Sequence, residues 1–169
     1  GYAITSAQGL KKGKTLDVSN ESASFGSAEV LAVDVSTGLA LLRVDSILRS
    51  SVPFRLSRTE GAIGDEMISL GYSEDQLLFS DATTQYLNDE ITRIAGNFLA
   101  PGAPLISDQG ELMGIVIESE MGHLSVGVGD IFEFLENKST VEIKLPTRNK
   151  LYYDSTARRV EKLRPCVLK

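Results

Sequence analysis

Few side chains in this sequence could do chemistry, and most of them lack a partner. His123 is the only histidine and Cys166 the only cysteine, so neither a histidine-based metal site nor an internal disulfide can be assembled. Gly127-Val128-Gly129 lacks the glycine-lysine-serine continuation of a phosphate-binding loop. Neighbouring carboxylates suggest acid–base catalysis at three places, where surface charge is the better interpretation: Asp65-Glu66, Asp89-Glu90 and Glu118/Glu120. We therefore expect no metal and no cofactor.

Residues 97–117 show the most specific order of residue types in the chain. A turn of small residues that contains Pro101 runs into a short apolar strand at Pro104–Ile106. A polar turn at Asp108-Gln109-Gly110 follows, and then a second apolar strand over 112–118. Two strands joined by such turns must present the first turn at one end of a β-sheet.

This order resembles the nucleophile turn of trypsin-like serine proteases, closest to the HtrA/Deg branch. In that branch Gly-Asn-Ser-Gly-Gly-Pro-Leu is followed by a turn and by Gly-Glu-x-x-Gly-Ile. The chain keeps seven of these residues: Gly102, Pro104, Leu105, Gly110, Glu111, Gly114 and Ile115. The nucleophilic serine falls on Pro101, and the glycine that supplies the second oxyanion donor falls on Leu99. Proline has neither a hydroxyl nor an amide hydrogen, so the resemblance implies loss of both nucleophile and oxyanion hole.

The other two triad positions follow from two further segments. Residues 1–10 look like the family's Gly-Tyr-Ile-Leu-Thr-Asn-Ala-His-Val-Val, which places the general base on Gln8. Residues 33–44 look like Asp-x-x-x-Asp-Leu-Ala-Val-Leu-Lys-Ile, which places the orienting aspartate on Gly38. A glutamine does not take up a proton near neutral pH. The resemblance therefore implies a pseudoprotease with vestigial triad positions at Gln8, Gly38 and Pro101 and a vestigial oxyanion position at Leu99.

The pattern along the chain predicts an all-β fold, which the resemblance makes a chymotrypsin/trypsin-like double β-barrel with a short C-terminal helix. Alternating or continuous apolar runs between turn residues predict strands at 2–5, 15–19, 28–34, 39–44, 54–56, 64–72, 76–86, 91–95, 104–106, 112–118 and 124–129. Residues 130–136 carry apolar side chains at helical spacing and begin with a capping residue, Asp130.

We divide the chain into an N-terminal barrel (1–56), a C-terminal barrel with its closing helix (57–136) and a basic linker or tail (137–158). Residues 159–169 look like the opening strand of the family, which would normally precede Gly1. A circular permutation, a following tandem copy or a fragment numbered out of order would each explain this position. We predict that Pro165–Lys169 pairs with the first barrel, in the same chain or by exchange between copies; a chance match in a short basic tail is the alternative.

Charge is distributed unevenly along the 169 residues. The net charge is −6, but residues 138–169 carry nine basic against three acidic side chains, and residues 1–137 carry eight against twenty, a net −12. An acidic body argues against nucleic acid as the main partner. No apolar run approaches the roughly 18 residues of a membrane span. The basic tail can dock on the acidic body or on another copy, or remain solvated.

The favoured function is binding or assembly without catalysis. Ser125, Val126 and Gly127 are expected where the family's substrate main chain pairs, so an extended peptide or a protein partner would add there, in the cleft between the barrels. Related inactive domains act as scaffolds, in homo-oligomers, or in tandem with an active protease, and the family is best known in the periplasm and in organelles. The alternative is an active serine hydrolase with relocated catalytic residues, for which Ser6, Ser107 and Ser125 are available although no Ser-x-x-Lys spacing stands out.

Overall fold

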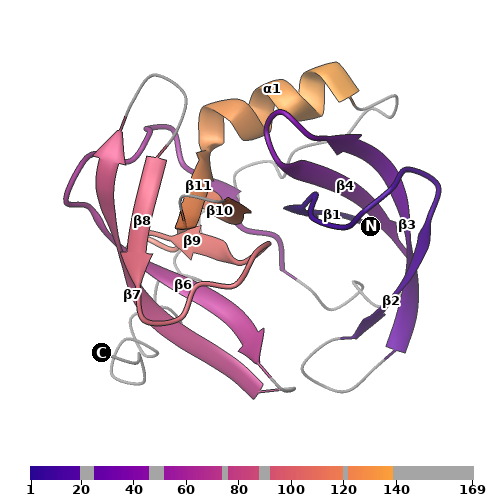
Figure 1. Cartoon of the computed structure of the whole chain (residues 1–169), viewed down its shortest axis with the longest axis horizontal. Helices are drawn as coiled ribbons and strands as arrows, with labels where there is room; N and C mark the ends of the chain where they lie inside the picture. Colours follow the sequence, from indigo (N-terminus) through magenta and orange to yellow (C-terminus); the bar gives the residue numbers. More distant parts are fainter. Residues whose placement is uncertain (20–24, 46–51, 74–75, 88–91, 120–121, 139–169) are drawn as a thin grey trace.

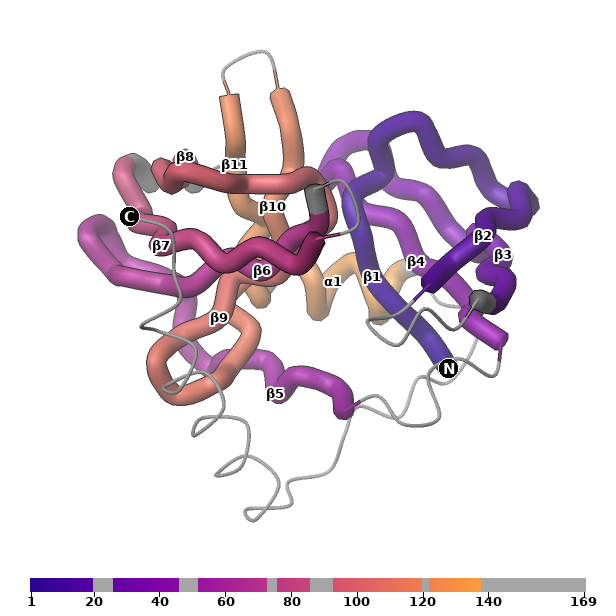
Figure 2. The backbone as a smooth tube through the Cα atoms, turned by 90° about the horizontal axis from the view of Figure 1, so that it is seen from below, coloured from indigo at the N-terminus to yellow at the C-terminus, as the bar shows by residue number. Residues whose placement is uncertain are grey.

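The computed structural model of this chain describes residues 1–19, 25–45, 52–73, 76–87, 92–119 and 122–138. Two groups of strands lie side by side, and a single helix crosses their junction on one side (Figures 1 and 2). The predicted all-β class with a short C-terminal helix is confirmed. Within the described residues, no helix is long and apolar enough to cross a lipid bilayer.

The N-terminal part of the chain forms a four-stranded antiparallel sheet. Its strands are β1 (Tyr2–Ser6), β2 (Thr15–Ser19), β3 (Phe25–Asp34) and β4 (Leu39–Val44), in the spatial order β1-β4-β3-β2. β4 lies inside the sheet and is buried at all but one of its positions, because its run of leucine, alanine and valine faces apolar neighbours on both sides. β2 lies at an edge and alternates between exposed and half-buried residues, as its alternating sequence predicts.

The remaining strands form a closed barrel. They are β5 (Arg55–Leu56), β6 (Glu66–Ser73), β7 (Gln76–Leu87), β8 (Thr92–Gly96), β9 (Pro104–Ile106), β10 (Glu111–Ser119) and β11 (Gly122–Gly127). The order β11-β8-β7-β6-β9-β10 returns to its start through the β10–β11 pairing, which closes six strands into a barrel. Closure removes the unpaired edges that an open sheet would leave.

The short strand β5 corrects one expected boundary. The sequence pattern places residues 54–56 in the N-terminal barrel, whereas Arg55 and Leu56 pair in parallel with Glu111 and Leu112 of β10. An ion pair between Arg55 Nη1 and Glu111 Oε1, 2.9 Å apart, supports the same pairing. The N-terminal sheet therefore ends with β4, and the segment after it already belongs to the barrel.

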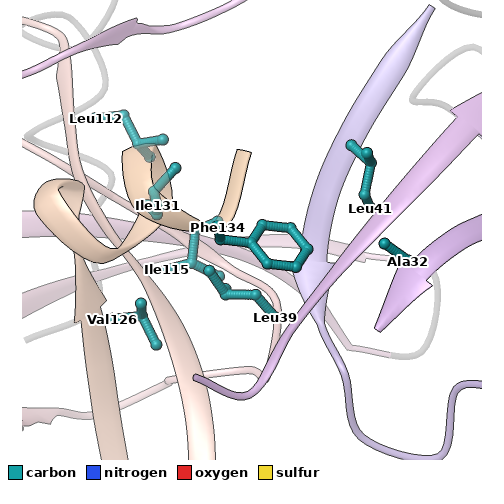
Figure 3. Close-up of a cluster of buried hydrophobic side chains, with 8 residues drawn as sticks. All are labelled: Ala32, Leu39, Leu41, Leu112, Ile115, Val126, Ile131 and Phe134. Atoms are coloured by element: carbon teal, nitrogen blue, oxygen red, sulfur yellow. The ribbon is translucent and has the colours of Figure 1, made fainter. Parts of the chain in front are cut away.

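One hydrophobic cluster joins the two halves and the helix (Figure 3). Its buried members are Ala32, Leu39 and Leu41 of the first sheet, Leu112, Ile115 and Val126 of the barrel, and Ile131 and Phe134 of the helix. Phe134 is only 2% exposed and lies between the side chains of the two halves. Each half also has a buried cluster of its own, so this shared cluster joins two cores through the helix.

The helix α1 (Val128–Lys138) is longer than predicted. It begins two residues before Asp130, so Asp130 lies in the first turn and does not act as the N-cap. The cap comes from Glu60, in the loop before β6. The backbone amide of Gly129, at the start of the helix, donates to Oε1 of Glu60, 2.6 Å away. A carboxylate from a distant loop thus satisfies one of the amides that a helix start leaves unpaired. The sequence could not reveal this cap because Glu60 is far away in the chain.

The helix also extends through Lys138, so the expected tail (137–158) begins within it. The rest of that tail, and residues 159–169 with their predicted strand at Pro165–Lys169, lie outside the described residues. These predictions therefore remain predictions.

Candidate functional site

A pocket of about 900 Å³ lies between the first sheet and the barrel. Its walls come from the loop after β1 (residues 6–10), the β3–β4 turn with the end of β3 (33 and 35–38), the end of β10 (117–119), β11 (124–126) and Asp130 of α1. Two of the three predicted triad positions, Gln8 and Gly38, line it. Val35 stands on its rim with 88% of its surface exposed.

Gln8 links the two halves of the molecule across this pocket. Its side-chain amide nitrogen Nε2 donates to Glu118 Oε2 of β10, 3.0 Å away. Its backbone amide donates to Ser6 Oγ at 3.3 Å, which holds the loop after β1. The residue before it, Ala7, donates its amide to the carbonyl of Gly38 at 2.7 Å. The positions of Gln8 and Gly38 are thus fixed next to each other by the backbone.

A side chain at Gly38 would be strained and crowded. Its φ of +71° is in the left-handed region, where side chains other than glycine are strained. A Cβ built on it would lie 3.2 Å from Cδ1 and 3.3 Å from Cγ2 of Ile117, so Ile117 would have to shift by a few tenths of an ångström. The end of β10 therefore crowds the position to which the resemblance assigns an orienting carboxylate.

Pro101 is exposed and lies in the turn before β9. Leu99 is 8% exposed and packs in the barrel core near Gly96, so it serves as an anchor for the turn. The Gly102 amide donates to the Val116 carbonyl at 2.7 Å. Gly102 also lies against β1, because a Cβ on it would collide with Oγ1 of Thr5. The turn that contains Pro101 therefore touches the strand that leads to Gln8, although Pro101 itself does not line the pocket.

The predicted peptide-binding strand is occupied at one of its three residues. Ser125 pairs with Val116 of β10 on one side and with Thr92 of β8 on the other, so both of its edges are taken. β8 pairs with neither Val126 nor Gly127 in the described strands, although Glu60 packs against Gly127. Addition of a peptide at Val126 and Gly127 therefore stays a prediction.

The other strand of this hairpin, β10, has an open edge of its own. Val116 of β10 bonds to the Pro101 turn through both its amide and its carbonyl. In an antiparallel sheet alternate residues direct their main-chain groups to the same edge, so the next such residue is Glu118. No described residue pairs with the main chain of Glu118 on that edge, which faces the pocket.

The charged side chains that line the pocket are both carboxylates, Glu118 and Asp130. Burial raises the pKa of Asp130, and the neighbouring carboxylates of Glu60 and Glu133 raise it further. These four acidic groups come from the loop before β6, from β10 and from the first two turns of α1. The described lining of the pocket therefore carries two carboxylates and no basic side chain.

The other chemical candidates do not form a second centre in the described part of the chain. His123 lies opposite Glu118 in the β10–β11 register and does not line the pocket. Ser107 Oγ accepts from the amides of Gln109 and Glu111 and so shapes the turn before β10. Three acidic or sulfur candidates fall outside the described residues: Cys166, Asp89-Glu90 and Glu120. Within the described ranges no group of histidine, cysteine and carboxylate side chains could hold a metal ion.

Several solved protease structures share this architecture. The Rv3671c protease in its inactive form gives a TM-score of 0.69 at 17% identity, covering 82% of this chain and 79% of that one. An inactive serine-to-alanine variant of Rv3671c from M. tuberculosis H37Rv gives 0.70 at 17% identity, covering 85% and 80%. The active form from M. tuberculosis gives 0.69 at 17% identity, covering 87% and 72%. At this identity the similarity shows the fold alone.

No curated protein matches the sequence significantly. The family model described as the trypsin-like peptidase domain matches residues 1–115, which include the first sheet, the Pro101 turn and most of the barrel. The chain therefore belongs to the trypsin-like peptidase domain family.

Proposed function

We propose that this chain is a catalytically inactive trypsin-like domain, a pseudoprotease, which binds an extended peptide or protein segment in the cleft between its two halves. The observation that carries this proposal is the contact of Ile117 with Gly38. The resemblance assigns the orienting aspartate to this position, and the Ile117 side chain crowds a Cβ placed there.

The chemistry of the other two positions supports the loss of catalysis. Acyl transfer needs an activated nucleophile, a base that accepts its proton, and donors directed at the oxyanion. Pro101 offers neither a hydroxyl nor an amide hydrogen. Gln8 donates its side-chain amide to Glu118 and has no proton-accepting nitrogen. Among the described residues that line the pocket there is no histidine, lysine or cysteine to replace it.

The retained cleft supports the binding half of the proposal. The main-chain groups of Glu118 face the pocket without a strand partner, so an extended segment can pair there and continue the barrel wall. Apolar side chains line the same pocket and give such a segment surface to bury, among them Leu10, Val33, Ile117 and Leu124.

Within the family, we place the chain on the HtrA/Deg branch. This placement rests on the order of retained residues from Gly102 to Ile115, which spans β9 and the start of β10. Inactive relatives of that kind serve as scaffolds, and we propose the same role here, toward another copy of this chain or an active protease domain.

Two measurements test the proposal. Labelling with an active-site-directed fluorophosphonate should modify no serine, while an active trypsin-like protease in the same mixture is labelled. Stoichiometric modification of Ser6 or Ser125, both of which line the pocket, would establish instead an active serine hydrolase with relocated residues.

The binding half is tested by main-chain substitution at the open edge. A fluorescent, acetylated peptide of alternating valine and threonine should bind the full chain, remain uncleaved, and lose most of its affinity for Glu118→Pro. Proline removes the outward-facing amide hydrogen of an edge residue, whereas Glu118→Gln keeps it and serves as the control. Equal binding by wild type and Glu118→Pro, or cleavage of the peptide, would refute the proposal.

A further inference from the structure

The outer face of the β6–β7 hairpin carries an apolar surface. Strand residues alternate between two faces, and Met67 and Ala82, which lie opposite each other, belong to the barrel core. The outward positions nearest the turn form two opposed pairs, Leu70 with Phe79 and Tyr72 with Leu77. Tyr72 is 52% exposed, and the other three side chains are half-buried. We call these four residues the hairpin patch.

Two acidic residues lie at the other end of the same face. Glu66 and Asp81 are on the same side as the hairpin patch, because each is an even number of residues from it along its strand. Both are exposed, and neither takes part in the ion pairs formed within the described ranges. Apolar surface bordered by polar residues is typical of an interaction site.

The chain itself contains a segment of matching order. Residues 148–153 have the sequence Arg-Asn-Lys-Leu-Tyr-Tyr, in which two basic side chains precede three apolar or aromatic ones. We propose that this segment docks on the hairpin patch of the same chain, with its apolar residues on the patch and its basic residues near Glu66 and Asp81. The inference is independent of the proposed function, because the hairpin patch contains none of the residues that line the pocket.

Length and charge both favour this docking. Residues 139–169 lie outside the described part of the chain, and twelve of them (139–150) separate Lys138, the last residue of α1, from Leu151. An extended linker of that length spans about 40 Å, and a compact domain of this size is also about 40 Å across. Residues 139–169 carry eight basic against three acidic side chains, while residues 1–137 carry a net −12. Opposite charges therefore favour the return of the segment to the body.

The same patch on a second copy of the chain is a less suitable partner. A two-fold interface sets a patch against itself, so Glu66 and Asp81 of both copies would share it. Like charges at an interface oppose association. Residues 148–153 instead bring two positive charges to two negative ones, and they bring apolar side chains to the apolar end.

A single tryptophan can report this docking, because the chain contains none. In the full chain with Tyr153→Trp, docking should shift the emission to shorter wavelength and shield the indole from acrylamide, relative to the same chain in urea. Both effects should be independent of protein concentration, since the segment binds its own chain. Added salt should reduce them, because Arg148 and Lys150 contribute through exposed ion pairs.

Matched variants assign the shielding to the hairpin patch. Tyr72→Ser and Leu77→Ser should each lose most of the shielding, and Asp81→Asn should lose part of it. Tyr2→Ser removes a tyrosine of similar exposure, 40%, from β1 in the other half and should leave the shielding intact. Leu151→Ser changes only the segment, leaves the hairpin patch as it is, and should also release the tryptophan.

Shielding that is lost in the patch variants and kept in Tyr2→Ser would support the inference. Three results would overturn it. A tryptophan as accessible in buffer as in urea would show that the segment does not dock. Shielding that survives both Tyr72→Ser and Leu77→Ser would place the segment elsewhere. Shielding that appears only as the protein concentration rises would assign the patch to another copy.

Discussion

The contact between Ile117 and Gly38 can be measured through stability. Gly38→Ala introduces a Cβ at a φ of +71°, 3.2 Å from Cδ1 and 3.3 Å from Cγ2 of Ile117. Left-handed backbone costs a non-glycine residue about 1–2 kcal/mol. Insertion of a methyl group into a packed site costs about 1–3 kcal/mol more. We therefore expect Gly38→Ala to lower the free energy of unfolding by about 2–5 kcal/mol, as the sum of these two ranges.

A second glycine separates the two contributions. Gly9 has nearly the same φ, +70°, but a Cβ built on it would meet nothing within 4 Å. Gly9→Ala should show the backbone cost alone, so Gly38→Ala should be less stable than Gly9→Ala by about 1–3 kcal/mol. Each kcal/mol lowers Tm by about 2–4 °C in a domain of this size. Urea unfolding and thermal scans of both variants give the comparison.

The excess cost must also depend on Ile117. In an Ile117→Ala background both contacting methyl groups are gone, and the difference between Gly38→Ala and Gly9→Ala should vanish in a double-mutant cycle. Equal stabilities of Gly38→Ala and Gly9→Ala in the native background would refute the conclusion that β10 fills the space beside Gly38. The inactive-domain proposal would then lose its main structural support.

The same contact decides whether a triad can be rebuilt, and three further predictions concern the helix and its first turn. Gln8→His, Gly38→Asp and Pro101→Ser together should restore no peptide hydrolysis; recovery of hydrolysis would show that an aspartate fits under Ile117. Asp130→Asn should raise the urea midpoint near neutral pH. The pKa of Asp130 is raised in the folded state, so stability is lost as pH rises from the unfolded-state pKa of this group through its folded-state pKa. That gain should disappear in acid, where both states are protonated, and a constant gain at all pH values would contradict the assignment. Glu60→Ala should cost about 0.5–2 kcal/mol by removing the acceptor at Gly129, whereas Glu60→Gln retains an acceptor and should cost less; both should lower the pKa of Asp130 in an NMR titration. Phe134→Ala should cost about 3–5 kcal/mol and leave one cooperative transition, because its ring packs against both halves; separate transitions for sheet and barrel would contradict a shared core.

The strands were predictable because their patterns are local. β2 and β4 have the bounds that the sequence predicts, since alternation in one and a continuous apolar run in the other show how many faces are buried. The half to which β5 belongs is not predictable, because a strand of two residues carries no such pattern. Its partner is decided by pairing with β10, more than fifty residues away, which no local signal records.

The candidate site was only partly predictable, for a related reason. The resemblance identifies Gln8, Gly38 and Pro101 by the segments that contain them, and the backbone contacts bring those segments together. The resemblance places the binding edge on β11, and the sequence does not show that β8 pairs with one of its residues, Ser125. The sequence indicates only surface charge at Glu118. Its position two residues after the buried Val116 does not reveal an open strand edge.

Two of the predicted triad positions connect the two halves. Gln8, in the loop after β1, bonds to Glu118 of the barrel, and Gly38, in the β3–β4 turn, packs under Ile117 of the same barrel strand. In a working triad, a histidine at position 8 would bond to an aspartate at position 38. The side chains of Ile117 and Glu118 at the end of β10 would then have to move away from these two positions. The end of β10 thus holds the halves together with its side chains at residues 117 and 118, while the main chain at 118 faces the pocket.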